Sequence, residues 1–308
     1  MNKPLERIAQ KGKLSIGLVM PLEAYIGAVP VLENQETLAG LAEEMGFKAL
    51  WFRDVPFHDP SFGDVGQMYD PWVYMTHIMH HTGQITLATG SIILPLRHPA
   101  HIVKSMNSLQ NLSGGRFVMG IASGDRPIEY PAFGQSIAEK ASLFRDSFEY
   151  IQALSGRFPR YKSEYYGEVN GAIDLLPKST VQTPLLVTGH SGQSLDWIAE
   201  HGDGWLYYPR NHSSLHQIMS DWQNALSRAG SDWKPYMQSL YLDFIYDAHP
   251  EPTPIHLGFR AGIDYTLHYL KELESIGVNH VIINLKFSSR PVEQVIRQLG
   301  EHVLPHFR

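Results

Sequence analysis

The strongest constraint on the fold is a regular alternation of strand-like and helical patterns that runs along the whole chain. Short apolar runs rich in Val, Ile and Leu begin at eight places, and such runs between turn residues predict buried β-strands. The predicted strands are Leu14–Met20, Ala49–Phe52, Ile85–Leu94, Arg116–Ala122, Leu185–Thr188, Gly204–Tyr208, Ser239–Tyr246 and Val278–Leu285.

Eight segments with helical periodicity follow these runs in turn. They are Asn34–Met45, Pro71–Thr82, Pro99–Leu112, Ile137–Leu154, Ser194–His201, Ser213–Ala229, Gly262–Ile276 and Val292–Phe307. Strands that are buried on both faces and separated by helices indicate a parallel sheet, and eight such units close naturally into a barrel. We therefore expect an α/β fold with a single (β/α)₈ barrel. An open doubly wound sheet is the alternative, because periodicity does not show closure.

Two connections are longer than ordinary loops, and a third is rich in proline. Val55–Asp70 and Ser155–Pro184 exceed the usual length, which is typical of loops that serve function. His249–Phe259 contains three prolines and is expected to be stiff and extended. We expect these inserted loops to shape the mouth of a pocket. No repeat or low-complexity segment marks a boundary, so residues 1–308 are interpreted as one domain.

Composition and charge argue against several classes of protein. The chain has 25 basic and 31 acidic residues, a formal charge of −6 and no basic cluster, so a nucleic-acid partner is not expected. It has no cysteine, which rules out thiolate catalysis and Cys-based metal sites. No stretch reaches the roughly 18 consecutive apolar residues of a membrane span, and we expect a cytoplasmic protein without a membrane partner. The P-loop and nucleophile-elbow motifs are also absent, which leaves nucleotide hydrolysis and the usual serine hydrolysis without support.

The segment from Val187 to Ser194 is the most informative for binding. A strand ends in Gly189, and small residues then lead into a helix. Because a helix start has unpaired N–H groups and a partial positive charge, small residues there allow a phosphate to approach closely. The hydroxyls of Ser191 and Ser194 would add donors. The alternative is that Ser191 is simply the residue that caps the helix.

Two further segments lie where strands are predicted to end. Thr89–Pro99 joins the third strand to its helix, and Gly90 allows unusual backbone geometry there. Ser113–Asp125 reads as a helix stop, a buried strand and a glycine-containing loop. Active sites of barrels form at these strand ends. The alternative for the first segment is a proline-punctuated turn that leaves Arg97 and His98 in solvent.

Together these segments resemble the bacterial-luciferase-like monooxygenase family. The resemblance is carried by five motifs in the family's order, and it covers nearly the whole chain. The motifs are Thr89 through Leu94-Pro95-x-x-His98-Pro99 to Leu112-Ser113-Gly114-Gly115-Arg116-Phe117; Gly120-x-x-x-Gly124; Gly189-His190-Ser191-Gly192 with His201-Gly202-Asp203-Gly204-Trp205; Gly277–Ile282; and Val303–Phe307. The resemblance implies a barrel that binds FMN or a deazaflavin.

The resemblance also implies roles for particular residues. Gly90 and Ser91 would be joined by a non-proline cis peptide, in a bulge against the central ring of the flavin. Ser123 and Asp125 would lie beside the isoalloxazine ring or the ribityl chain, and the segment 191–194 would hold the phosphate. The expected cofactor-binding residues are Thr89, Gly90, Ser91, Ser123, Asp125, Gly189, His190, Ser191, Gly192, Gln193 and Ser194.

The chain departs from the family after the second strand. Several relatives have an acidic residue there followed by a pair of histidines, whereas this chain has Asp54 followed by Val55-Pro56-Phe57. Asp54, Arg53 and His58 are the candidate catalytic residues. The alternatives are a structural pair between Arg53 and Asp54, and a solvent-facing His58.

Other residues are weaker candidates. Tyr25, which follows the first predicted strand, and Arg260, which follows the proline-rich connection, are candidate pocket residues. No metal is expected from His77, His80 and His81, because no nearby carboxylate completes a ligand set. Five aromatic residues would either roof a pocket or belong to the core: Phe57, Phe62, Tyr69, Trp72 and Tyr74.

The function implied by the resemblance is an FMN-dependent monooxygenase. Such an enzyme uses reduced FMN, supplied by a separate reductase, and oxygen to oxidise a small organic substrate, and it is expected to form a homodimer or homotetramer. A deazaflavin-dependent dehydrogenase or reductase is the first alternative. A flavin-binding protein without catalysis, and a barrel hydrolase or isomerase that uses the same phosphate site, are the others.

Overall fold

Eight parallel strands form a closed barrel in the computed structural model, which describes residues 3–62, 68–245 and 251–307. Each strand pairs with the next around the ring, β8 pairs with β9, and β12 closes the ring on β1. The strands are β1 (Ser15–Val19), β2 (Ala49–Phe52), β3 (Thr86–Ile93), β4 (Phe117–Ala122), β7 (Leu185–Thr188), β8 (Gly204–Tyr207), β9 (Tyr236–Phe244) and β12 (His280–Asn284). The expected barrel is confirmed, and the open sheet is excluded.

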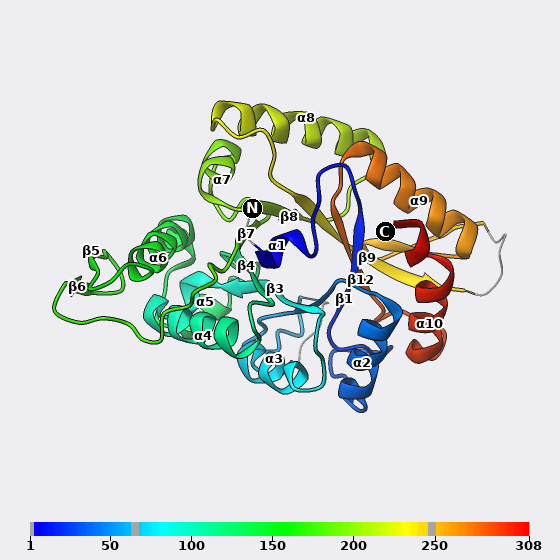
Figure 1. Cartoon of the computed structure of the whole chain (residues 1–308), viewed down its shortest axis with the longest axis horizontal. Helices are drawn as coiled ribbons and strands as arrows, with labels where there is room; N and C mark the ends of the chain where they lie inside the picture. The colour runs from blue at the N-terminus through cyan, green and yellow to red at the C-terminus, as the bar shows by residue number, and fades with distance from the viewer. Residues whose placement is uncertain (1–2, 63–67, 246–250, 308) are drawn as a thin grey trace.

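Helices surround the strands, as Figure 1 shows. Their bounds agree with the predicted ranges to within three residues, and those of α4 agree at both ends, but α10 ends at His302 and not at the predicted Phe307. They are α2 (Gln35–Met45), α3 (Pro71–Met79), α4 (Pro99–Leu112), α6 (Lys140–Leu154), α7 (Leu195–His201), α8 (His212–Arg228), α9 (Ile263–Ile276) and α10 (Val292–His302). Local chemistry sets several starts: the Asp70 side chain accepts hydrogen bonds from the N–H groups of Trp72 and Val73, with Pro71 at the first helical position.

Two apolar cores lie on the two faces of the barrel wall. The outer core joins the strands to the surrounding helices. The inner core includes Trp51, Ala88, Val118 and Leu186, which point into the barrel because successive side chains of a strand face opposite sides. Leu5, Ile8 and Ala9 belong to this inner core as well. Leu5 lies in the short helix α1 (Lys3–Glu6), and Ile8 and Ala9 follow it; α1 lies near the centre of the ring of helices in Figure 1 and fills the amino-terminal end of the barrel.

Two hairpins occupy connections in which the sequence predicted no strands. The first, β5 (Arg160–Lys162) and β6 (Glu168–Asn170), lies within the long 155–184 connection. In the second, β10 (Thr253–Ile255) is extended as expected, but the chain then turns back as β11 (Gly258–Ala261).

The strand β11 pairs with the second half of β9. The strand β9 begins at Tyr236, three residues before the predicted start at Ser239. Its predicted end, Tyr246, lies outside the described residues, as do His249 and Pro250 of the proline-rich connection. In the described ranges, no helix combines the length and apolar character needed to cross a membrane.

Candidate active site

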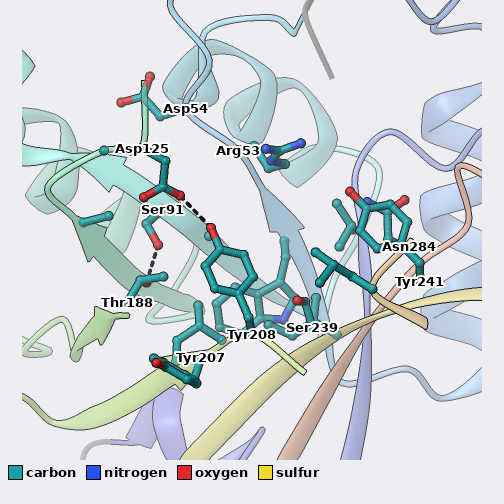
Figure 2. Close-up of a pocket in the computed structure, with 18 of the residues that line it drawn as sticks. Arg53, Asp54, Ser91, Asp125, Thr188, Tyr207, Tyr208, Ser239, Tyr241 and Asn284 are labelled. Carbon is teal, nitrogen blue, oxygen red and sulfur yellow. Dashed lines mark hydrogen bonds between the residues drawn. The ribbon is translucent and has the colours of Figure 1, made fainter. Parts of the chain in front are cut away.

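A cavity of about 480 Å³ opens at the carboxyl ends of the barrel strands. Its size is in the range of small-molecule and cofactor sites, and its position is the one at which (β/α)₈ barrels carry their active sites. Every barrel strand, or the loop that follows it, contributes to the lining, and Figure 2 shows most of the polar members. The lining includes Val19, Trp51, Arg53, Asp54, Gly90, Ser91, Asp125, Arg126, Thr188, Leu206, Tyr207, Tyr208, Arg210, Ser239, Tyr241 and Asn284.

A bulge in β3 places Gly90 and Ser91 in this lining. The pairing of β3 with β4 shifts between Thr89 and Ile92, and the peptide between Gly90 and Ser91 is cis, as the resemblance implies. The bulge depends on Gly120 of β4, where a Cβ atom would lie only 2.0 Å from the Thr89 carbonyl oxygen. Thr89 itself is buried and does not line the cavity; its hydroxyl donates a hydrogen bond to the Gly120 carbonyl at 2.9 Å.

The indole of Trp51 forms part of the cavity wall next to Gly90 and is held from inside the barrel. Its N–H donates to Nε2 of the fully buried His280 at 3.0 Å, and the other ring nitrogen of His280 lies 2.6 Å from the Ser15 hydroxyl. The Ser15 hydroxyl in turn donates to the Ile8 carbonyl. These roles require neutral His280 with its proton on Nδ1. Burial lowers the pKa of His280 to about 3, in agreement with that state.

Two hydrogen bonds connect side chains on the other side of the cavity (Figure 2). The hydroxyls of Ser91 and Thr188 bond to each other, which links β3 to the end of β7. The Tyr208 hydroxyl donates to the Asp125 carboxylate at 2.6 Å, which links the end of β8 to the loop after β4. Ser123, the neighbour of that loop's Gly124, is buried; its N–H donates to the Ser191 hydroxyl oxygen at 3.1 Å.

The expected phosphate segment, 189–194, directly follows the cavity residue Thr188 but does not itself line the cavity. Ser191 is buried, and its hydroxyl donates to the Thr188 carbonyl at 2.8 Å. The residue that caps α7 is Ser194, whose side chain accepts from the Trp197 N–H, so the alternative of Ser191 as the cap is wrong. Gly192 packs closely on Ala141, where a Cβ atom would lie 2.5 Å from the alanine Cβ.

Gln193 is also tied to α6, through both ends of its amide. Its nitrogen donates to the Ala141 carbonyl at 2.9 Å, and its oxygen accepts from the Arg145 guanidinium at 2.9 Å. His190, Gly192 and Ser194 are exposed. The segment is therefore a fixed turn whose outer surface faces solvent beside a cationic side chain.

Asp54 pairs with Arg97, and not with Arg53. Its two carboxylate oxygens accept from Nε and Nη2 of Arg97, each at 2.8 Å, and one of them also accepts from the Ile93 N–H at 3.2 Å. The Asp54 side chain is only 2% exposed. Arg97 also bonds Asp70 at 2.9 Å, so the expectation that Arg97 is simply solvated is wrong. Because both of its oxygens accept from Arg97, this carboxylate holds another side chain in place and is not directed at a substrate.

Of the four remaining candidate residues, one lines the cavity and three do not. Arg53 lines the cavity, whereas His58 is exposed and lies outside the lining. Tyr25 packs on Val55 and Met68 outside the lining, and its ring lies 4.9 Å from the Lys286 ammonium group. Arg260 is also outside the lining; it pairs with the buried carboxylate of Asp243 at 2.5 Å.

The aromatic residues and histidines singled out from the sequence lie in different parts of the structure. Phe62 lines the cavity, and the Arg126 guanidinium lies 4.7 Å above its ring. Tyr74 and Trp72 pack in the outer core, while Phe57 and Tyr69 are exposed. His77 hydrogen-bonds Glu36. In the part of the chain that the structure describes, no three His, Asp or Glu side chains form a group that could hold a metal ion.

Sequence reasoning missed several polar residues of the cavity wall. Tyr207 ends β8, Tyr208 and Arg210 follow it, Ser239 and Tyr241 belong to β9, and Asn284 ends β12; none was singled out from the sequence. Ser239 and Tyr241 lie at the start of the predicted strand Ser239–Tyr246 and gave no such signal, but the other four lie at or just after the carboxyl end of a predicted strand. The rule that barrel sites form at these ends could have found them.

Comparison with known proteins agrees with this architecture. The model of the luciferase-like monooxygenase family matches residues 15–252, which is more than half of the chain. The alkanal monooxygenase alpha chain of Photorhabdus luminescens is 26% identical over 168 residues, 54% of this chain and 44% of that protein. The 4-hydroxyprotoasukamycin monooxygenase of Streptomyces nodosus subsp. asukaensis is 25% identical over 211 residues, 64% of this chain and 56% of that protein. The matches therefore span about half the length of these relatives.

Solved structures share the fold at low identity. Monooxygenase RslO1 from Streptomyces bottropensis has a TM-score of 0.80 and 18% identity, with 96% of this chain and 100% of that chain covered. An F420-dependent secondary alcohol dehydrogenase has a TM-score of 0.77 and 18% identity, covering 96% and 99%. The oxygenating constituent of 3,6-diketocamphane monooxygenase from Pseudomonas putida, in complex with FMN, has a TM-score of 0.75 and 13% identity, covering 96% and 99%. The barrel, the cavity at its carboxyl end and the family match together lead to one assignment: this chain belongs to the luciferase-like monooxygenase family.

Proposed function

We propose that the chain is an FMN-dependent monooxygenase that oxidises a small organic substrate in the 480 Å³ cavity. The observation that carries the proposal is the β3 bulge at Gly90 and Ser91, which lies beside Trp51 in the cavity of a family barrel. Reduced FMN, when bound, supplies the electrons with which molecular oxygen is activated. The chain's own residues would bind the cofactor, orient the substrate and exclude water.

The cavity fits a flat, largely apolar ring on one side. At Gly90 no side chain intervenes between the backbone and the cavity, and Val19, Leu206 and Ile282 add apolar surface. Polar groups face the same space from Ser91, Thr188 and Asp125. This combination of apolar walls with a few placed polar groups is typical of cofactor sites.

The 189–194 turn fits a phosphate at the outer end of the cavity. It follows directly on Thr188, and the main-chain N–H groups of Gly192 and Ser194 donate no hydrogen bond within the described part of the chain. Arg145 lies beside the turn and supplies positive charge. Unpaired N–H groups and a cation are the groups that bind phosphate. We propose the main-chain N–H groups of Gly192 and Ser194 as the phosphate-binding groups, with Gln193 holding the turn on α6.

The residues around the cavity would orient the substrate and exclude water. Tyr241, Asn284 and Ser239 face the cavity from strands opposite the bulge, so they are positioned to contact the substrate. Asp54 is assigned a positioning role, because Arg97 holds it. A separate flavin reductase as the source of reduced FMN, and a homodimer or homotetramer, remain part of the proposal.

Equilibrium titration with oxidised FMN, reduced FMN and a deazaflavin, followed by flavin fluorescence or calorimetry, tests the proposal. We expect FMN in one redox state to bind at micromolar or lower concentration. Replacing Ala122 by Phe, which adds a ring to the cavity lining, is expected to weaken binding at least tenfold. Ala172→Phe, on an exposed loop outside the lining, is the control and is expected to bind as the unaltered protein does.

The other outcomes of the titration distinguish between the alternative functions. Binding of the deazaflavin with no binding of FMN in either redox state would favour a deazaflavin-dependent dehydrogenase or reductase, and it would overturn the proposed cofactor. Tight FMN binding without oxygen consumption in any substrate screen would indicate a flavin-binding protein without catalysis. No affinity for any flavin would overturn the proposal as a whole.

A further inference from the structure

A second cavity, of about 370 Å³, adjoins the first on the outer side of β9. The strand separates the two, because Ser239 and Tyr241 line the first cavity while Leu240, between them, lines the second. The β10–β11 hairpin and the helix α9 supply most of the second cavity's wall. Its lining consists of Pro209, Arg210, Asn211, Leu240, Pro252, Pro254, Ile255, Leu257, Gly258, Phe259, Tyr265 and Tyr269.

Arg210 and Leu257 line both cavities and therefore form the partition between them. Arg210 is the one lining residue of the second cavity with a permanent charge. Its guanidinium lies 5.0 Å above the Tyr207 ring and 3.5 Å from the Pro209 carbonyl, and within the described ranges it forms no ion pair. A cation with free donors thus lies at the edge of a chamber whose other lining side chains, apart from Asn211, are apolar or aromatic.

The β10–β11 hairpin supplies residues to both cavities. Residues 253–261 lie beyond the range that the family model matches, 15–252. Yet the hairpin contributes His256 and Leu257 to the first cavity and Ile255, Leu257 and Phe259 to the second. Loops added to a common barrel are where substrate choice is made.

We propose that the second cavity is a substrate subsite, and that the substrate is an organic anion with an elongated apolar body. Arg210 binds the anionic end at the partition, next to the first cavity, and the apolar body lies in the second cavity. The assignment of this ligand as substrate rests on the proposed function. The second cavity also provides room for a substrate, since a bound flavin ring would take up much of the first cavity.

Isothermal titration of the protein without flavin tests this inference, with n-alkanoates of six to fourteen carbons and the matching 1-alkanols as probes. Alkanoate affinity is expected to rise about fourfold for each added methylene until the chamber is full. Arg210→Leu should weaken alkanoate binding at least tenfold and leave alkanol binding unchanged. Ile255→Trp, which places an indole in the second cavity, should end the rise at a shorter chain.

Two matched variants serve as controls. Arg157→Leu removes an exposed arginine, and Val73→Trp adds an indole to an exposed helix position, both outside the two linings; each should bind every probe as the unaltered protein does. If Ile255→Trp does not fold, Tyr265→Ala enlarges the chamber instead and should extend the rise to longer chains.

Equal affinity for alkanoates and alkanols, or an unchanged chain-length profile in Ile255→Trp, would overturn the inference. Since no flavin is present, the result is separate from the flavin titration. Failure of FMN binding with these probe effects intact would reject the proposed function and keep the anion subsite. FMN binding with no probe effect would reject the anion subsite and keep the proposed function.

Discussion

Both oxygens of the Asp54 carboxylate accept hydrogen bonds from one guanidinium, that of Arg97, in the connection between β3 and α4. The pair joins segments 43 residues apart and fastens the loop after β2 to the edge of the cavity. Because Asp54 is one of the candidate catalytic residues, the pairing matters for the choice among them. It leaves Asp54 as a residue that shapes the cavity wall, and Arg53 as the neighbour that faces the cavity.

We expect Arg97→Met to lower the free energy of unfolding by about 3 kcal/mol, because it leaves a buried carboxylate without its cation. The double variant Arg97→Met with Asp54→Asn should recover part of this loss, since the unpaired charge is then removed. Urea denaturation followed by circular dichroism measures both. A loss of stability that is equal in the single and double variants would show that the pair contributes nothing beyond packing.

The partner of Asp54 was not predictable from the sequence. The adjacent Arg53 was the obvious choice for a structural pair, but neighbouring residues on an extended segment point in different directions. Arg97, in a proline-punctuated turn, gave no sign of being half-buried. The parallel pairing of β2 with β3 brings the ends of these two strands together, so the ion pair is a consequence of tertiary structure.

At the scale of secondary-structure elements, the bulge in β3 is made possible by its neighbour β4. Thr89 and Gly120 approach so closely that a side chain on Gly120 would meet the Thr89 carbonyl oxygen at 2.0 Å. Gly120 does not need an unusual backbone angle, so its requirement is space alone. The two strands therefore determine together how Gly90 and Ser91 are presented to the cavity.

Gly120→Ala should accordingly destabilise the protein and displace the bulge. We expect a loss of about 1–3 kcal/mol in the free energy of unfolding, as for overpacked core positions, together with weaker FMN binding. Gly83→Ala is the matched control, because a Cβ atom there meets nothing within 4 Å. Denaturation and flavin titration of the two variants give the comparison. A Gly120→Ala protein as stable as the control would contradict the role given to this contact.

The elements themselves were largely predictable, and the reasons differ for those that were not. Strands buried on both faces and amphipathic helices have strong periodic patterns, which is why all eight barrel strands were found and the bounds of α4 agree. The hairpin β10–β11 contains Pro254 and Gly258, residues that usually argue against a strand. Pro254 is tolerated because β10 is an edge strand. Gly258 is required because a Cβ atom there would lie 1.8 Å from the Tyr241 carbonyl oxygen.

For the molecule as a whole, the two ends of the barrel have opposite characters. The amino-terminal end is filled by α1 and the residues that follow it, while the carboxyl end opens into the two cavities. The His280 chain of hydrogen bonds connects these ends: it starts at the Ile8 carbonyl, passes through Ser15 and His280, and ends at the Trp51 indole in the cavity wall. The cavity wall is thus supported from the closed end.

This support predicts how the stability of the whole fold depends on pH. Burial lowers the pKa of His280 to about 3 in the native state, whereas an unfolded histidine titrates near 6.5. Between these values the unfolded state binds a proton that the native state does not, so stability falls as the pH is lowered below about 6.5. Each pH unit in this window costs at most about 1.4 kcal/mol for this one histidine.

His280→Gln removes the titrating group, and its amide can accept the Trp51 N–H. The variant is expected to be less stable than the unaltered protein at pH 7.5, where the native contacts are lost without compensation, and the difference should shrink as the pH falls toward 5. The range from pH 5 to 7.5 avoids most carboxylate titration, since unperturbed Asp and Glu have pKa values near 4. Urea denaturation at half-unit intervals measures the difference. A stability difference that is constant across this range would mean that His280 takes up its proton in the folded protein, and that the neutral hydrogen-bond chain to Trp51 is not the native state.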